Sequence, residues 1–481
     1  MVLDVAIIGS GFGGLGAAVR LRQAGIHNFT ILERASDLGG TWRDNTYPGC
    51  RCDVASNLYS FSFAPNPAWS NTYSFQPEIL AYLQDVATDH HLRESIRFNH
   101  DVQSVDFDET KRRWRLRTSQ GDIEARAVIL ATGPLAEPRL PAIEGLDHFA
   151  GTIMHTAQWD QNVDLSGRRV AVIGTGASAV QTVPRIAPLV ARLDVFQRTP
   201  TWVLPHLGQP VPERTRRLFA KVPLTQRLVR YWTYWRRELM VLGFVKDPSR
   251  MTKAETMSKE HLARQIDDPA LRAKLTPNYR LGCKRVTISN DFYPALAREN
   301  VDVVTDAIVR AEPGGLVTAD GVLHEADVIV AATGFLVTDN PIGQRVHGAH
   351  GRALADAFEA GLANYKGTSF PDFPNLFMLS GPNTGLGHSS IVFMEESQLN
   401  YVIGALNVAL STNTMVAPTE AAATTWTRAL HEKMPSTVWG SGCASWYLNR
   451  NGQNTTIWPD FTFTFRRATR HFVRSDHVIS H

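Results

Sequence analysis

The run GSGFGG, residues 9–14, has the spacing Gly-x-Gly-x-x-Gly that lets a backbone turn approach a phosphate closely. The apolar stretch VAII precedes it and the helix-compatible LGAAVRLRQAG follows it. This order predicts a buried strand, a turn at Gly9, Gly11, Phe12 and Gly14, and a helix whose N-terminus binds a pyrophosphate. Glu33 ends the next apolar segment, FTILE, where a carboxylate accepts a hydrogen bond from a ribose hydroxyl. The alternative is a purely structural strand, turn and helix.

The pattern returns at VAVIGTGASA, residues 170–179. Aligned without a gap, residues 174, 176, 179 and 198 fall on residues 9, 11, 14 and 33, so Arg198 replaces the carboxylate of Glu33. A guanidinium favours a 2′-phosphate, and one such bond of ~1.5–3 kcal/mol selects NADP over NAD roughly tenfold to a hundredfold. The first unit is therefore predicted to bind FAD and the second NADPH, the latter through Gly174, Thr175, Gly176, Ser178, Ala179, Gln181, Arg198 and Thr199. The alternative for Arg198 is a solvated strand end.

Two such units in one chain are typical of disulfide reductases, N-hydroxylating monooxygenases, and flavin monooxygenases that act on carbonyls or heteroatoms. A reductase needs two cysteines that form a bridge beside the flavin, but Cys50 and Cys52 are separated by one residue, which strains a bridge. The remaining cysteines are Cys283 and Cys443, and no C-x-x-C occurs, so neither a metal site nor a redox disulfide is predicted. This cysteine usage favours the cytoplasm.

Two longer motifs narrow the choice. Residues 149–160, FAGTIMHTAQWD, match the pattern F-x-G-x-x-x-H-x-x-x-W-(P/D) at Phe149, Gly151, His155, Trp159 and Asp160. Residues 39–53 match G-G-x-W-x-x-x-x-Y-P-G-x-x-x-D from Gly39 to Asp53. With the segments GCKRVTISNDFY and ASWYL, these motifs resemble those of the type I Baeyer–Villiger monooxygenases along nearly the whole chain. The chain is shorter than many members that oxidise cyclic ketones, and its C-terminal WPDFTFTFRR differs from theirs.

The resemblance implies an NADPH-consuming, FAD-dependent monooxygenase. It inserts one oxygen atom from O₂ next to a ketone carbonyl, through a C4a-peroxyflavin, to give an ester or lactone. The implied catalytic cation is Arg285, because an arginine stays charged and stabilises negative oxygen, with Asp53 as its orienting partner. Lys284 helps Arg198 hold the 2′-phosphate. The other implied cofactor contacts are Gly40, Thr41, Trp42, Tyr59 and Trp446. On residue types alone, Lys284 and Arg285 would be an exposed basic pair.

His155 lies in a segment that joins the first unit to the strand beginning at Arg169. We expect this segment to let one domain shift against the other during catalysis, with Gly151 providing a bend and Phe149 and Trp159 anchoring its ends. His155 is then a hydrogen-bonding strut that couples domain position to the active site. The alternative is an ordinary linker.

The elements that position these residues predict an α/β fold with two Rossmann-like domains and a helical insertion. The FAD domain is predicted at 1–148 and 327–481, the NADP domain at 149–200 and 282–326, and the insertion at 201–281. The strands VILATG and VIVAATGF, at 128–133 and 328–335, mark where the chain passes between domains. The loop 381–388, GPNTGLGH, precedes a helix that either points toward the flavin or is a plain capped turn.

The insertion is rich in Arg, Leu, Trp and Tyr, as in RLVRYWTYWRRELMVLGF. It covers the substrate pocket, contacts a membrane surface or partner, or packs against the NADP domain; we favour packing. The net charge of +3 is spread along the chain and argues against nucleic-acid binding. No apolar run reaches the roughly 18 residues of a membrane span, and no signal peptide is predicted.

Two other functions remain open from the sequence. A heteroatom oxygenase would oxidise sulfides or amines with the same cofactors. A non-catalytic FAD- and NADP-binding redox sensor, or a leaky NADPH oxidase, would consume NADPH without oxygenating a ketone. Neither the ketone nor the number of subunits follows from residue spacing.

Overall fold

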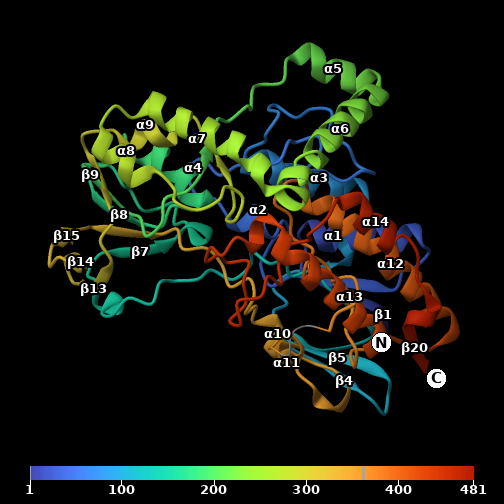
Figure 1. Ribbon diagram of the computed structural model, residues 1–481. Helices are drawn as coiled ribbons and strands as arrows, with labels where there is room; N and C mark the ends of the chain where they lie inside the picture. Colours follow the sequence, from blue (N-terminus) through green and yellow to red (C-terminus); the bar gives the residue numbers. More distant parts are fainter. Residues whose placement is uncertain (1, 360–362, 481) are drawn as a thin grey trace.

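Two separate sheets carry the two glycine-rich turns in the computed structural model, which describes residues 2–359 and 363–480 (Figure 1). Each turn leads from a buried strand into a helix, β1 (Val2–Ile8) into α1 (Phe12–Gln23) and β8 (Arg169–Ile173) into α4 (Ala177–Ile186). The prediction of an α/β fold with two Rossmann-like units is confirmed.

The first sheet is mixed. Its parallel part has the order β3-β2-β1-β6-β18, in which β18 pairs with the second half of β6. The first half of β6 pairs antiparallel with β5, and β4 and β17 follow β5 in the sheet. Alternate residues of β1 face opposite ways: Val5 and Ile7 pack against α1 and α12, and Ala6 and Ile8 pack toward β4 and β5. The other elements are β2 (Phe29–Leu32), β3 (Ile96–Arg97), β4 (Val102–Asp108), β5 (Arg113–Thr118), β6 (Gly121–Leu130), β17 (Val346–His347), β18 (Leu376–Met378), α3 (Gln76–Asp89), α10 (Ile342–Arg345), α11 (Leu354–Glu359) and α12 (Ile391–Thr412).

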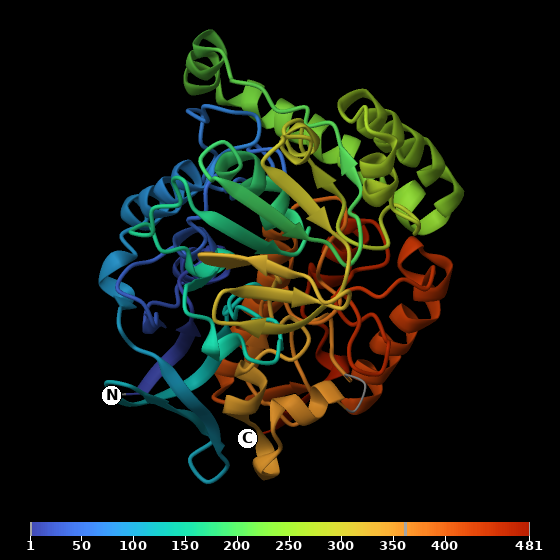
Figure 2. The same cartoon turned by 90° about the vertical axis from the view of Figure 1, so that its left-hand side faces the viewer.

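The second sheet is entirely parallel, in the order β12-β9-β8-β16-β7. Val170 and Val172 of β8 pack on the side of the helices, whereas Ala171 and Ile173 face a small antiparallel sheet, β13-β14-β15. Figure 2 turns this part of the molecule toward the viewer. The elements are β7 (Thr152–His155), β9 (Arg192–Phe196), β12 (Val301–Val304), β13 (Ile308–Glu312), β14 (Gly315–Thr318), β15 (Leu323–Glu325), β16 (Val328–Ala331) and α9 (Phe292–Leu296).

One predicted boundary is wrong. We placed residues 327–481 in the first domain, but β16 pairs with β7 and β8 and so belongs to the second sheet. Its apolar run VIVA is buried on both sides, which the sequence could not assign to one sheet or the other. The chain crosses between sheets after β6 and after β16, and these crossing segments pair through Pro138 and Phe335. The divisions at 148/149, 200/201 and 281/282 stay predictions.

The insertion is helical and divides into two parts. Helices α7 (Met251–Gln265) and α8 (Pro269–Leu275) pack on the second sheet, as we expected, through Leu262 and Leu275. Helices α5 (Glu213–Lys221) and α6 (Pro223–Glu238) instead run along the first domain and extend beyond the rest of the molecule (Figure 1). The expected packing of the whole insertion against the second domain is therefore wrong for α5 and α6, which leave many apolar side chains exposed.

Candidate active site

The first glycine turn leaves no room for a side chain at Gly14. A Cβ at Gly14 would lie 1.9 Å from the carbonyl oxygen of Gly9, and one at Gly40 would lie 3.2 Å from the Cα of Gly11. Gly11 is the N-cap of α1, and no side chain caps its backbone N–H groups. Phe12 begins the helix and is buried against the ring of Tyr59, at 5.1 Å between centroids. Free N–H groups at a close-packed helix start suit a dinucleotide pyrophosphate.

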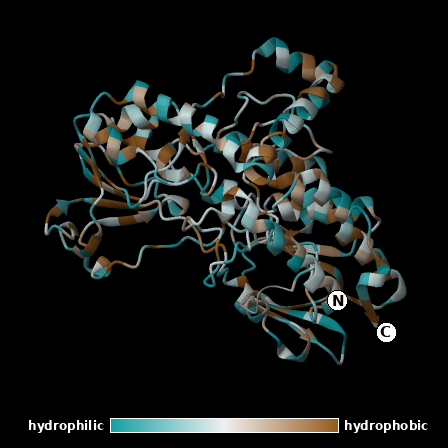
Figure 3. Ribbon diagram, viewed as in Figure 1, coloured by the Kyte–Doolittle hydropathy of each residue, from teal (hydrophilic) through white to brown (hydrophobic). Residues whose placement is uncertain are grey.

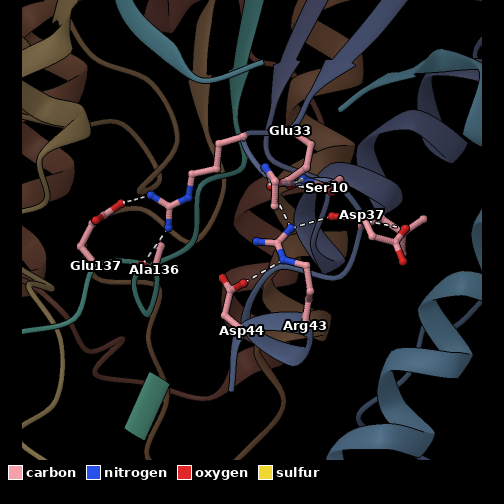
Figure 4. A network of polar contacts seen from close by, with 10 residues as sticks. Ser10, Glu33, Asp37, Arg43, Asp44, Ala136 and Glu137 are labelled. Atoms are coloured by element: carbon pink, nitrogen blue, oxygen red, sulfur yellow. Dashed lines mark hydrogen bonds and ion pairs between the residues drawn. The ribbon is translucent and has the colours of Figure 1, made fainter. Parts of the chain in front are cut away.

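Glu33 lies directly after β2, as predicted, but its carboxylate already has partners within the protein (Figure 4). Oε2 accepts hydrogen bonds from Ser10 N at 3.1 Å and Ser10 Oγ at 2.6 Å. Oε1 contacts the Arg43 guanidinium at 2.8 Å and accepts from Ala35 N at 3.0 Å. Glu33 therefore closes the loop around Ser10, and a ribose hydroxyl would have to share its oxygens with Arg43 and Ser10. Arg43 was missed by sequence reasoning.

The motif at 39–53 extends from the first turn to the second domain. Thr41 and Trp42 open α2 (Thr41–Asp44), and Trp42 Nε1 donates to the Tyr59 hydroxyl at 3.1 Å. Further along, the Tyr47 hydroxyl donates to Gln181 Oε1 of α4 at 3.0 Å. Gly49 lies so close to α4 that a Cβ there would be 2.6 Å from the Gln181 carbonyl oxygen. Gln181, predicted as a cofactor contact, thus connects the two domains.

The second glycine turn repeats the first with less crowding. Gly174 has a φ of +111°, which favours glycine, and a Cβ there would lie 2.6 Å from the Ala332 carbonyl oxygen. Gly176 is the N-cap of α4 without a side-chain cap, and Ala179 is fully buried. Thr175 Oγ1 donates to the Thr199 carbonyl at 2.9 Å. Ser178 is half-buried near the helix start.

Two cations lie near one another beside this turn. Arg198 follows β9 and is exposed, and Lys284 lies half-buried with its ammonium 5.0 Å from the centre of the Tyr279 ring. Burial lowers the pKa of Lys284, and repulsion from Arg198 lowers it further. The structure therefore brings Arg198 and Lys284 close enough to repel. A bound phosphate would relieve this repulsion.

Asp53 and Arg285 form a bidentate ion pair across the domain boundary. Arg285 Nε and Nη2 donate to Asp53 Oδ2 at 2.9 and 2.6 Å, and Nη2 also donates to Oδ1 at 2.7 Å. Burial would raise the pKa of Asp53, but the guanidinium outweighs it and the pKa lies below the ordinary value. Asp53 likewise raises the pKa of Arg285. Both groups are therefore charged.

The rest of the Arg285 guanidinium remains accessible. Nη1 donates to the Leu386 carbonyl at 2.9 Å, and its second N–H has no partner within residues 2–359 and 363–480. The side chain is 32% exposed, so a small molecule can reach it. Leu386 lies in the loop 381–388 before α12. Through the Leu386 carbonyl, this loop helps to hold the Arg285 guanidinium in place. Ser390, the N-cap residue of α12, makes no side-chain hydrogen bond to the first turn of that helix.

Sequence reasoning missed two neighbours of this pair. Arg237 of α6 donates to the Asp53 carbonyl at 3.2 Å and to the Tyr73 hydroxyl at 3.2 Å. It stands among several arginines of α6, so spacing could not single it out. The buried Tyr447 lies near enough to Arg285 to affect its pKa, and burial raises the pKa of Tyr447 to about 12. Trp446, the predicted contact, is 44% exposed, and its role stays a prediction.

The segment 149–160 contains a short strand and is therefore not an ordinary linker. Residues Thr152–His155 form β7, the edge strand of the second sheet. Trp159 packs against the cores of both domains, whereas Phe149 packs under β8 in the second domain and so does not anchor the segment in the first. A Cβ at Gly151 would lie 2.3 Å from the Asp327 carbonyl oxygen, so this glycine serves close packing instead of the bend that we expected.

His155 is buried at the end of β7. Its Nδ1 accepts from Ala157 N at 3.0 Å, so the proton of the neutral ring is on Nε2, and the ring meets Phe335 of the crossing segment edge-on. Burial lowers the pKa of His155, although a backbone contact at Gly334 opposes this, and the ring is uncharged at neutral pH. His155 thus contacts the segment by which the chain returns to the first domain.

The structure contains a disulfide that the cysteine spacing does not indicate. Cys283 and Cys443, with Cα atoms 6.3 Å apart, form it, whereas from the sequence we considered only metal sites and redox disulfides. The two are 160 residues apart, and only folding brings them together. Cys50 and Cys52 are free, as their spacing predicts, and both are buried; burial raises the pKa of Cys50 to about 12. A buried, protonated thiol is a poor nucleophile, so the pair beside the first turn is unsuited to disulfide reduction.

Comparison with known proteins agrees with this geometry. A family profile described as pyridine nucleotide-disulphide oxidoreductase matches residues 6–207. A Baeyer-Villiger monooxygenase of Streptomyces coelicolor is 51% identical over 97% of this chain and 90% of its own length. One of Pseudomonas aeruginosa is 45% identical over the same shares. An oxidized steroid monooxygenase bound to NADP superposes with a TM-score of 0.85 at 32% identity, over 97% of this chain and 96% of its own. Cyclohexanone monooxygenase from Rhodococcus sp. Phi1 bound to NADP+ gives 0.89 at 28% identity, over 100% and 99%.

Proposed function

Because the chain belongs to the Baeyer–Villiger monooxygenases, we propose that its FAD- and NADPH-dependent reaction with O₂ converts a ketone into an ester or lactone. One observation carries the proposal to this particular chain. Arg285 is held by Asp53 and the Leu386 carbonyl, and its side chain remains 32% exposed.

The first turn fits FAD. Its closely packed glycines leave the α1 N-terminus open to a pyrophosphate, and Phe12, Trp42 and Tyr59 form an aromatic cluster beside it. When bound, FAD supplies the acceptance of a hydride from NADPH and the activation of O₂. Glu33 supports a ribose contact through the oxygens that it shares with Ser10 and Arg43.

The second turn fits NADPH. The α4 N-terminus is open to a pyrophosphate, and Arg198 with Lys284 would hold the 2′-phosphate. Each of these cations would gain a charge-assisted hydrogen bond that NADH cannot form. Gln181 would hold the two domains in register through Tyr47 and Arg51 while the cofactor is bound.

Arg285 would stabilise negative charge on the reacting oxygen atoms. Its charge is secured by Asp53, and its orientation by two Asp53 oxygens and the Leu386 carbonyl. A fixed cation costs little reorganisation as charge develops, which is how such groups lower a barrier. The buried Tyr447 lies near enough to Arg285 to influence its pKa, so this part of the site is partly shielded from solvent.

A product assay tests the proposed function. The purified protein, loaded with FAD, is given NADPH, air and a panel of cyclic, linear and aryl ketones, with a sulfide assayed alongside. We expect ester or lactone from at least one ketone, at a yield that accounts for most of the NADPH consumed. Sulfoxide as the only product would favour the heteroatom alternative. Conversion of all NADPH into hydrogen peroxide with every ketone would favour a leaky oxidase.

Replacing His155 with alanine tests the coupling role proposed for it. We expect FAD to remain bound but hydrogen peroxide to rise several-fold per NADPH consumed, because β7 loses its contact with the crossing segment at Phe335. Peroxide and ester are measured in the same reaction. The matched control is His148→Ala, whose ring is exposed on the approach to the same segment. Unchanged coupling in H155A would make His155 a packing residue only.

The pH dependence of NADPH use tests Lys284. The ammonium must be charged to hold a phosphate, and its pKa is lowered, so the charge is lost at a lower pH than in an ordinary lysine. We therefore expect kcat/KM for NADPH to decline as pH rises through this pKa, while kcat/KM for NADH does not decline with it. Lys284→Arg should remove the decline. A parallel decline for both cofactors would place the titrating group elsewhere.

The compartment stays a prediction. The sequence favoured the cytoplasm, but the Cys283–Cys443 disulfide weighs against a reducing compartment. Blocking free thiols in intact cells before lysis, then reducing the protein and counting the thiols released, would establish which form the cell contains.

A further inference from the structure

Helix α6 turns its polar side toward the protein and its apolar side toward the solvent. Its side facing the protein carries polar groups: Gln226 donates to Asn66 O at 2.6 Å, and Arg230 donates to Asn57 O at 2.8 Å. Further along the same side, Arg237 bonds to Asp53 O, and Glu238 accepts from Thr462 Oγ1 at 2.6 Å. A surface helix normally buries its apolar stripe and exposes its polar side, so α6 reverses the usual arrangement.

The side of α6 facing solvent carries the apolar stripe. Its members recur at spacings of three and four, so they share one face of the helix. They are Leu224, Leu228, Tyr231, Trp232, Trp235 and Leu239, which we call the α6 stripe. Trp232 is 66% exposed, Leu239 is 63% exposed and Leu224 is 62% exposed. Leu218 and Val222 continue the exposed apolar surface onto α5, where brown bands lie at the outer edge of the molecule (Figure 3).

Exposed cations border the α6 stripe. They are Arg214, Arg217, Lys221, Arg227 and Arg236. The only acids of residues 213–240 are Glu213, which pairs with Arg217, and the buried Glu238. Apolar and aromatic side chains flanked by basic ones are the pattern of a helix that lies in the interface of an anionic bilayer. In a symmetric dimer formed through this face, the cations of the two copies would lie opposite one another. The repulsion between these like charges disfavours such a dimer.

We propose that the α6 stripe and its basic border bind the surface of a membrane rich in anionic lipid. The aromatic rings and leucines enter the headgroup region, and the arginines and Lys221 contact lipid phosphates. The helices extend beyond the rest of the molecule, so a flat surface can reach them without meeting either sheet (Figure 1, Figure 2). Within residues 2–359 and 363–480 no helix has the length and apolar character to cross a bilayer.

Vesicle binding of the FAD-loaded, full-length protein tests this. Vesicles of phosphatidylcholine alone are compared with vesicles containing about 30% phosphatidylglycerol, and the bound protein is sedimented. We expect binding to the anionic vesicles only, and weaker binding as salt is added. In the double variant Leu224→Ser with Trp232→Ser, the apparent affinity should fall at least about tenfold, because both exposed side chains lose their apolar burial.

Two further double variants separate the contribution of the basic residues from that of the apolar stripe. Arg227→Gln with Arg236→Gln should weaken binding to anionic vesicles while keeping the stripe intact. The matched control is Leu189→Ser with Val322→Ser, two exposed apolar residues of the second domain, which should bind like the wild type. NADPH consumption with a water-soluble ketone should be the same in all variants, which shows that they are folded.

Three results would overturn the proposal. The wild type would stay in the supernatant with both vesicle types, or the stripe variant would bind as well as the wild type. Alternatively, the wild type would be a dimer by light scattering that L224S/W232S converts to a monomer, which would assign the stripe to a second copy of the chain.

Discussion

Arg285→Ala is expected to stop ester formation while NADPH still reduces the bound FAD. The guanidinium is the only group near Asp53 that combines a fixed charge, a bidentate anchor and a free N–H within the described residues. Removing a fixed donor to a developing oxyanion costs about a hundredfold to a thousandfold in rate. The loss should therefore appear in the oxygenation step alone, and the NADPH consumed should be recovered as hydrogen peroxide.

Ester yield, peroxide yield and the rate of flavin bleaching by NADPH are measured on the same preparation. Arg280→Ala is the matched control, because Arg280 belongs to the same segment but pairs with Glu255 and does not touch Asp53. Arg285→Lys should recover part of the activity, since an ammonium keeps the charge but lacks the fork that fits a carboxylate. Ester formation by R285A at near the wild-type rate would contradict the assignment.

Loss of the two cations at the second turn is expected to have the next largest effect. In Arg198→Ala, kcat/KM for NADPH should fall roughly tenfold to a hundredfold, because one charge-assisted bond to the 2′-phosphate is lost. Lys284→Ala should add to this loss, although less than additively, since the two cations repel and act on one group. The value for NADH should be nearly unchanged in both variants.

The design separates recognition of the phosphate from damage to the domain. Arg192→Ala is the control, because Arg192 begins the same strand but pairs with Asp194 and Asp302 at its opposite end. Steady-state kinetics with both cofactors are measured for each variant. If NADPH and NADH lose efficiency equally in R198A, the residue supports the fold instead of reading the phosphate.

Local patterns predicted the parts of the site that are contiguous in sequence. Both glycine turns lie between a strand and a helix as expected, because glycine spacing and apolar runs are properties of neighbouring residues. The pairing of Asp53 with Arg285, across 232 residues, came from resemblance to a family and not from spacing. Local pattern alone would have made Arg285 an exposed basic residue.

Long-range packing explains the errors. The apolar sequence of the strand 328–331 is compatible with either sheet. Only its pairing with β7 and β8 shows that it belongs to the second sheet. Cys283 and Cys443 show no motif because their partnership depends on the fold. The sequence of α6 reveals an apolar stripe, but not that the polar side would face the protein. The polar side faces the protein because Asn57, Ser60 and Thr462 of the first domain form hydrogen bonds with it.

The disulfide has a mechanical consequence. Together with the backbone it closes a covalent ring from Cys283 to Cys443, which contains β16, the return crossing and α12. Whatever angle the two domains adopt, their separation at this point is fixed, with the Cα atoms 6.3 Å apart. If the two domains shift against one another during catalysis, Arg285, two residues from the link, would move less than the far edge of the second sheet. Such a link would keep the Asp53–Arg285 pair together while the angle between the two domains changes.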